Sequence, residues 1–134
     1  MFNEDVLDFI KIKEELAHHC GSTIAKEMAL ALAPMTDRKQ IQEALDETSE
    51  ALRSWQTEIE QPLGGTRDIR ESCKKSRKDF VLTREAIWDV YITIGAYKRM
   101  TKFFRTKYME YPLLSLWMQD MPNMDRVEQR LKRV

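Results

Sequence analysis

The sequence has little of what sheets, disulfide frameworks or membrane spans require. Its 134 residues include four glycines, four prolines and two cysteines, and no apolar run approaches 18 residues. So few turn residues argue against a sheet, and the short apolar runs predict neither a membrane span nor a membrane partner. The two cysteines, Cys20 and Cys73, match no zinc or redox spacing, which favours a reducing cytoplasm as the compartment.

The residues that are abundant predict an all-α protein. Apolar residues make up 43% of the chain and charged residues 33%, a balance typical of globular proteins rich in helix formers. We expect one helical core domain over residues 1–134, an irregular bundle of about six to seven helices. The last amphipathic pattern, residues 124–134, has no stop signal, so we expect the chain to be the N-terminal fragment of a longer protein.

Capping residues predict where the helices begin. Ser22, Asp37 and Thr83 each precede an apolar-periodic segment and can accept a hydrogen bond from its first turn. We expect the helix after Ser22 to reach residue 33 and the helix after Thr83 to be the longest, to about residue 108.

Two apolar stripes predict the buried helix faces. One follows Asp37 with a 4-3-4-3-4 spacing, and the other follows Thr83, widened by Trp88 and Tyr91. Val81 and Leu82, in the link before the second stripe, are expected to enter the core. The stripes consist of Ile41, Leu45, Thr48, Leu52, Trp55 and Ile59, and of Ile87, Val90, Ile94, Tyr97, Thr101 and Phe104.

Between these helices the segment "PLGGTRDIR", residues 62–70, predicts a turn followed by a short basic helix over 68–78. It fits neither the phosphate-binding Walker pattern nor a dinucleotide fingerprint, so it predicts no nucleotide site. Two interpretations stay open: a turn with a salt-bridged docking helix, or a helix N-terminus that holds an anion. Thr66 or Asp68 is expected to cap the helix. The turn is assigned to Pro62, Gly64 and Gly65, and the docking contacts to Arg67, Asp68 and Arg70.

Charge is unevenly distributed along the chain. Residues 1–60 carry 6 basic and 13 acidic side chains, and residues 61–134 carry 16 and 9. Cations concentrate in 67–78 and in 98–107, where three of them at i, i+4 and i+7 form a stripe able to follow a phosphate backbone. The alternative is that these cations pair with acids of the third helix or of another domain. The candidate nucleic-acid contacts are Lys98, Arg99, Lys102, Arg105 and Lys107.

No catalytic, cofactor-binding or metal-binding set is predicted, and we expect the chain itself not to be an enzyme. His18, His19 and Cys20 are consecutive, so on a helix they point about 100° apart and cannot close on one metal. Cys73 is interpreted as a packing cysteine. The acids Asp46, Glu47 and Glu50 are expected to form a solvated face.

Residues about 7–105 resemble the N-terminal region of bacterial MutS proteins of the second type, which lack the mismatch-recognition domains of mismatch-repair MutS. The sequence departs from that pattern at two places. Lys78, Asp79 and Phe80 stand where a Gly-Gly pair usually precedes Val-Leu, and Thr-Arg-Glu from Thr83 stands where Ser-Pro-Glu is usual. The matching positions are Gly21, Ala25, Lys26, Glu27, Ala29, Leu30, Pro34, Thr36, Asp37, Ile41, Glu47, Thr48, Ala51 and Leu52, and Pro62, Gly64, Gly65, Arg67, Asp68, Ile69 and Arg70.

The resemblance implies a fold like the helical core domain of MutS proteins. It also implies a homodimeric parent that hydrolyses ATP with Mg²⁺ in a downstream ATPase domain and clamps branched DNA or collided ribosomes, often with a terminal nuclease domain. This chain would then connect the ATPase to the lever arms. Two alternatives remain: a free-standing helical protein–protein interaction module, and a small nucleic-acid-binding domain.

Overall fold

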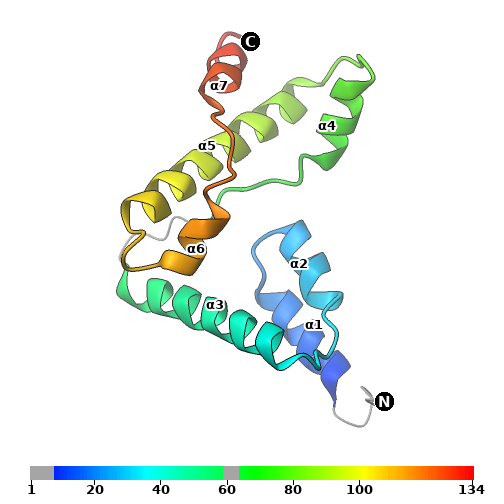
Figure 1. Cartoon of the computed structure of the whole chain (residues 1–134). Helices are drawn as coiled ribbons and strands as arrows, with labels where there is room; N and C mark the ends of the chain where they lie inside the picture. The colour runs from blue at the N-terminus through cyan, green and yellow to red at the C-terminus, as the bar shows by residue number, and fades with distance from the viewer. Residues whose placement is uncertain (1–7, 59–63) are drawn as a thin grey trace. The chain divides into compact units, whose positions relative to one another are not determined.

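The structure, a computed structural model, describes residues 8–58 and 64–134 and is all-helical over these residues, as predicted (Figure 1). The chain divides into two compact units, residues 1–36 and 37–134. Pro62 and Ile59 lie outside the described residues. Within the described part no helix combines the length and apolarity needed to cross a bilayer. The helices are α1 (Phe9–His19), α2 (Thr23–Leu30), α3 (Arg38–Thr57), α4 (Arg70–Arg77), α5 (Arg84–Thr106), α6 (Pro112–Trp117) and α7 (Asp125–Leu131).

The first unit consists of α1 and α2, which pack against each other. Their buried residues are Ala17 and Ala29, small side chains that allow a close approach of two helices. Ser22 caps α2 as predicted, since its Oγ accepts a hydrogen bond from the Ala25 amide at 3.2 Å. The helix ends at Leu30, three residues before the expected end.

The second unit is built around two long helices, α3 and α5. The Asp37 carboxylate accepts from the Gln40 amide at 2.8 Å, and the Thr83 hydroxyl accepts from the Ala86 amide at 3.2 Å. Both predicted caps are therefore confirmed. The longest helix is α5, as predicted, and it ends at Thr106.

The helix α3 does not bury the apolar stripe that its sequence suggests. Leu45, Leu52 and Trp55 are each more than half exposed. The buried residues of α3 are instead Glu50 and Ser54, and this helix packs on α6. Thr48, another member of the predicted stripe, is exposed as well. The prediction of a buried α3 stripe was therefore wrong at these four positions, because hydrogen bonding to α6 selects a polar face that periodicity alone does not mark.

The core of the second unit lies where α5 meets α6. Ile94 and Phe104 are buried as predicted, and Tyr111, just before α6, is buried with them. The Phe104 and Tyr111 rings meet edge to face with centroids 6.2 Å apart. Trp88 is 58% exposed, so its predicted place in the buried stripe was wrong.

The link from α4 to α5 carries a strained residue. Asp79 has a φ of 57°, in the left-handed region. Its amide donates to the Ser76 carbonyl and the Phe80 amide to the Lys75 carbonyl, which together form a Schellman motif that ends α4. Glycine normally occupies this position because a Cβ is disfavoured there. After this turn Val81 is 95% exposed, so its predicted place in the core was wrong.

We expect Asp79→Gly to raise the free energy of unfolding by about 0.5–1 kcal/mol, since relief of left-handed strain exceeds the added entropy of the unfolded chain. Urea unfolding followed by circular dichroism measures the change. Asp79→Ala is the control, because it removes the carboxylate but keeps the strain. Equal effects of the two variants would show that the side chain, and not the backbone, decides stability here.

Candidate functional site

Residues 64–70, an irregular stretch that ends at the first residue of α4, lie against α5. The Arg67 amide donates to the buried Thr93 hydroxyl at 2.9 Å, and the Arg67 guanidinium lies 4.0 Å from the Asp89 carboxylate. A Cβ at Gly65 would lie 3.9 Å from the Ala96 side chain. Gly65 lies near Ala96, and Arg67 lies near Thr93 and Asp89, so later residues of the segment meet earlier residues of α5. The segment therefore runs antiparallel to α5, and the Arg67 amide fixes its backbone.

The two glycines of this segment differ in what they require. Gly65 has a φ of 77°, a conformation that side chains rarely adopt, whereas a Cβ on Gly64 would meet nothing within 4 Å. The turn therefore requires glycine at position 65 and not at position 64.

Asp68 binds the start of α4. Its carboxylate accepts from the Arg70 amide at 3.2 Å and from the Arg70 Nε and Nη2 at 2.9 and 2.7 Å. These hydrogen bonds lower the pKa of Asp68 to about 2. The helix begins at Arg70, two residues after the predicted start, with Asp68 rather than Thr66 satisfying its first amide.

The Asp68 pair makes stability depend on pH. The pKa of Asp68 is about 2 in the folded chain, and the ordinary pKa of such a carboxyl is 3.8. The carboxylate therefore stabilises the fold fully above pH 3.8, and this contribution disappears as the pH falls towards 2. We therefore expect Asp68→Asn to lower the free energy of unfolding at neutral pH and to leave it nearly unchanged near pH 2. Chemical unfolding of both proteins across this range measures the difference, and a difference independent of pH would contradict it.

The predicted basic stripe of α5 is partly occupied by internal partners. Lys98 Nζ lies 2.6 Å from the Asp125 carboxylate and 2.5 Å from the Glu128 carboxylate, both on α7. These contacts raise the pKa of Lys98 and lower the pKa of both acids. Lys98 therefore holds α7 against α5.

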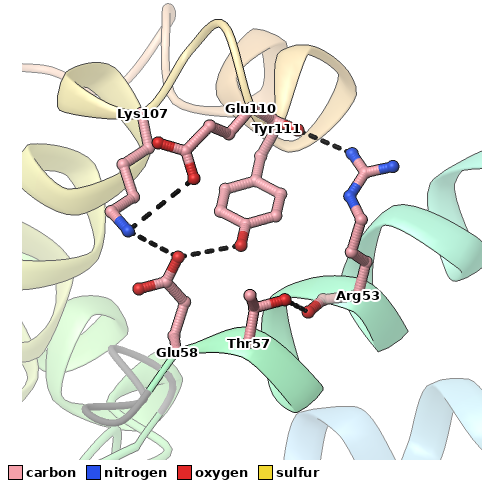
Figure 2. Close-up of polar contacts among 6 residues, drawn as sticks. All are labelled: Arg53, Thr57, Glu58, Lys107, Glu110 and Tyr111. Carbon is pink, nitrogen blue, oxygen red and sulfur yellow. Dashed lines mark hydrogen bonds and ion pairs between the residues drawn. The ribbon is translucent and has the colours of Figure 1, made fainter.

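Lys107 belongs to a second internal network, which joins the end of α3 to Tyr111 (Figure 2). Glu58 Oε1 receives hydrogen bonds from Lys107 Nζ at 2.5 Å and from the Tyr111 hydroxyl at 2.8 Å. These bonds lower the pKa of Glu58, while burial is the main cause of the raised pKa of Tyr111. Arg53 donates to the Glu110 carbonyl at 2.6 Å from the other side of the ring. The sequence left open whether Lys107 contacts nucleic acid or pairs with an acid of the third helix or of another domain. Its bond to Glu58, the C-cap residue of α3, is an internal pairing of the second kind.

Arg105 is exposed but has an internal partner, because its guanidinium donates to the carbonyl of Met118, the residue after α6, at 3.0 Å. Arg99 and Lys102 have no ion pair with any residue within 8–58 or 64–134. Both line an open groove of about 1070 Å³ between α5 and residues 121–125. The nucleic-acid role of the five cations in residues 98–107 stays a prediction, and Arg99 and Lys102 are the two whose side chains have neither an ion pair nor a hydrogen bond to the described residues.

Comparison with curated proteins identifies relatives over nearly the whole chain. Endonuclease MutS2 of Geobacillus sp. is 29% identical over 131 residues, 96% of this chain and 17% of the relative. Endonuclease MutS2 of Pelotomaculum thermopropionicum is 29% identical and that of Bacillus cereus 27%, each over 94% of this chain and 16% of the relative. The chain thus spans about a sixth of the length of the relatives that it matches. No family model matches the chain, and no solved structure matches it.

Sequence reasoning missed the role of Glu50. This carboxylate is 4% exposed and accepts from the amides of Leu113 and Leu114 at 3.1 and 2.8 Å, so it caps α6 from another helix. The predicted solvated face was wrong at Glu50. Pro112 could have revealed this role, because a proline there marks the start of a helix. The N-cap residue of that helix, Tyr111, provides no side-chain cap, so the first amides need an acceptor from elsewhere in the chain.

The residues described hold no group of three potential metal ligands. His19 lies 3.1 Å from Glu15, one turn earlier on α1. Cys73 is exposed on α4, a helix that buries no residue, so its interpretation as a packing cysteine was wrong.

Proposed function

We propose that this chain is a helical connector region of a protein of the MutS2 type, a longer protein that acts on nucleic acid. The similarity over 94–96% of the chain to proteins named Endonuclease MutS2 supports this proposal. In this proposal ATP and Mg²⁺ belong to an ATPase domain elsewhere in the protein. The partners are that domain, the lever arms, a second copy of the whole protein, and branched DNA or the ribosome.

A connector must move as one body, and the ties along α5 support this role. The segment 64–70 binds its middle, Lys98 fixes α7 to it, and the Glu58 network joins its end to α3. These attachments come from segments far apart in sequence, so a displacement at one end of α5 is transmitted to all of them as rigid-body movement. The backbone docking of residues 64–70 on Thr93 is the observation within the fold that carries the proposal.

The test replaces the matching region of Geobacillus Endonuclease MutS2 with this chain and measures nuclease activity and DNA-stimulated ATP hydrolysis. We expect the chimera to keep both activities, and a chimera with a glycine–serine linker of equal length to lose their coupling. Equal behaviour of the linker chimera would overturn the connector role. It would leave the two alternatives, an interaction module or a nucleic-acid-binding domain.

A further inference from the structure

The most concentrated free charge in the second unit lies on α4. Residues 71–80 contain four cations and two carboxylates, Glu71 and Asp79. Seven of the eight residues of α4 are exposed, and only Ser72 is partly buried. We define the α4 surface as Lys74, Lys75, Arg77, Lys78 and Phe80.

The cations of the α4 surface, unlike Lys98 and Lys107, have no ion pair with any residue that the structure describes. They are also not needed to cap the helix. The Schellman bonds already occupy the carbonyls of Lys75 and Ser76, so the last turn of α4 is satisfied by main-chain amides. These charges are therefore available to an external anion.

Phe80 adds an exposed aromatic side chain two residues after the last cation. Phe80 is 63% exposed, although its amide is fixed by a 3.1 Å hydrogen bond to the Lys75 carbonyl. An aromatic ring displayed from a rigid turn next to Lys78 has the chemistry of a base-stacking platform. Single-strand-binding proteins combine such rings with cations that follow the phosphates.

We propose that the α4 surface binds single-stranded nucleic acid, with Arg77 and Lys78 on the phosphates and Phe80 stacked on a base. The choice of nucleic acid as the polyanion rests on the proposed function. Binding is nevertheless a property of this chain alone, so a failed chimera and a failed binding assay are distinct results.

The test is fluorescence anisotropy of the 134-residue chain with a labelled mixed-sequence single strand of about 20 nucleotides, at salt from about 50 to 200 mM. Duplex DNA and phosphatidylserine vesicles are the comparison ligands. We expect the single strand to bind most tightly. No binding at the lowest salt, or binding to vesicles alone, would overturn the proposal.

Variants assign the binding to this surface. We expect the double reversal Arg77→Glu with Lys78→Glu to lower affinity at least about tenfold and to reduce the salt slope by about 1.4, the value for two lost phosphate contacts on a single strand. Arg77→Gln with Lys78→Gln gives the same direction with less strain on the helix end. Phe80→Ala is expected to lower affinity about tenfold and to leave the salt slope unchanged, since stacking releases no counterions.

The matched control is Arg126→Glu with Arg133→Glu, which changes net charge equally on and beyond α7. Circular dichroism verifies that each variant folds. An equal loss in the control would show that net charge alone decides binding. A loss confined to Lys102→Glu would place the contact on α5 and overturn the α4 assignment.

Discussion

Replacing Glu50 by alanine is expected to lower the free energy of unfolding of residues 37–134 by about 3 kcal/mol. The variant removes a buried carboxylate that accepts from the amides of Leu113 and Leu114, and it leaves both part-buried donors without their side-chain partner. Hydrogen bonds to a charged acceptor stabilise by about 1.5–3 kcal/mol each, and a negative charge at a helix N-terminus adds to this. Urea unfolding monitored by tryptophan fluorescence measures the change.

Glu43 provides the control for this variant. It lies on the same helix, is exposed and has a 3.8 Å ion pair with Lys39, so Glu43→Ala should change stability by at most about 0.5 kcal/mol. Glu50→Gln keeps one side-chain oxygen and should fall between the two. If Glu50→Ala proves as mild as Glu43→Ala, the start of α6 does not depend on Glu50.

The second large effect is expected at Gly65. Gly65→Val should lower the free energy of unfolding by about 2 kcal/mol, because a β-branched residue is strained at a φ of 77° and its methyl groups extend towards Ala96 and Arg99. We also expect the Arg67 amide to lose protection from hydrogen exchange, since its bond to Thr93 depends on the path of this turn. Chemical unfolding and amide exchange by NMR measure the two effects.

Gly64→Val is the matched control, one residue away and equal in the atoms added. A Cβ there meets nothing within 4 Å, so stability should stay within about 0.5 kcal/mol of the starting chain. Equal losses at both positions would mean that the whole pair, and not the left-handed residue, sets the turn.

The helix starts were predictable because their causes are local. Ser22, Asp37 and Thr83 each bond an amide three residues on, and such contacts depend only on neighbours in the sequence. The buried face of α3 was not predictable in the same way. Glu50 acts on a helix more than 60 residues later, and nothing near it in the sequence reveals that helix.

The basic stripe also shows that partners far away in the sequence cannot be predicted from local spacing. Its spacing correctly placed Lys98 and Arg105 on one helix, but their partners, the acids of α7 and the Met118 carbonyl, follow later in the chain. The turn residues were identified by type, and only the backbone geometry separates Gly65 from Gly64.

The attachment of α7 has a consequence for how the molecule responds to its solution. No residue of α7 is buried, and the helix is held to α5 by the Lys98 ammonium between two carboxylates. Attraction between charges at a surface weakens as ions accumulate around them, whereas the aromatic contacts of Tyr111 do not depend on ions in this way. We therefore expect rising ionic strength to weaken the attachment of α7 to α5 more than the packing of the interior around Tyr111.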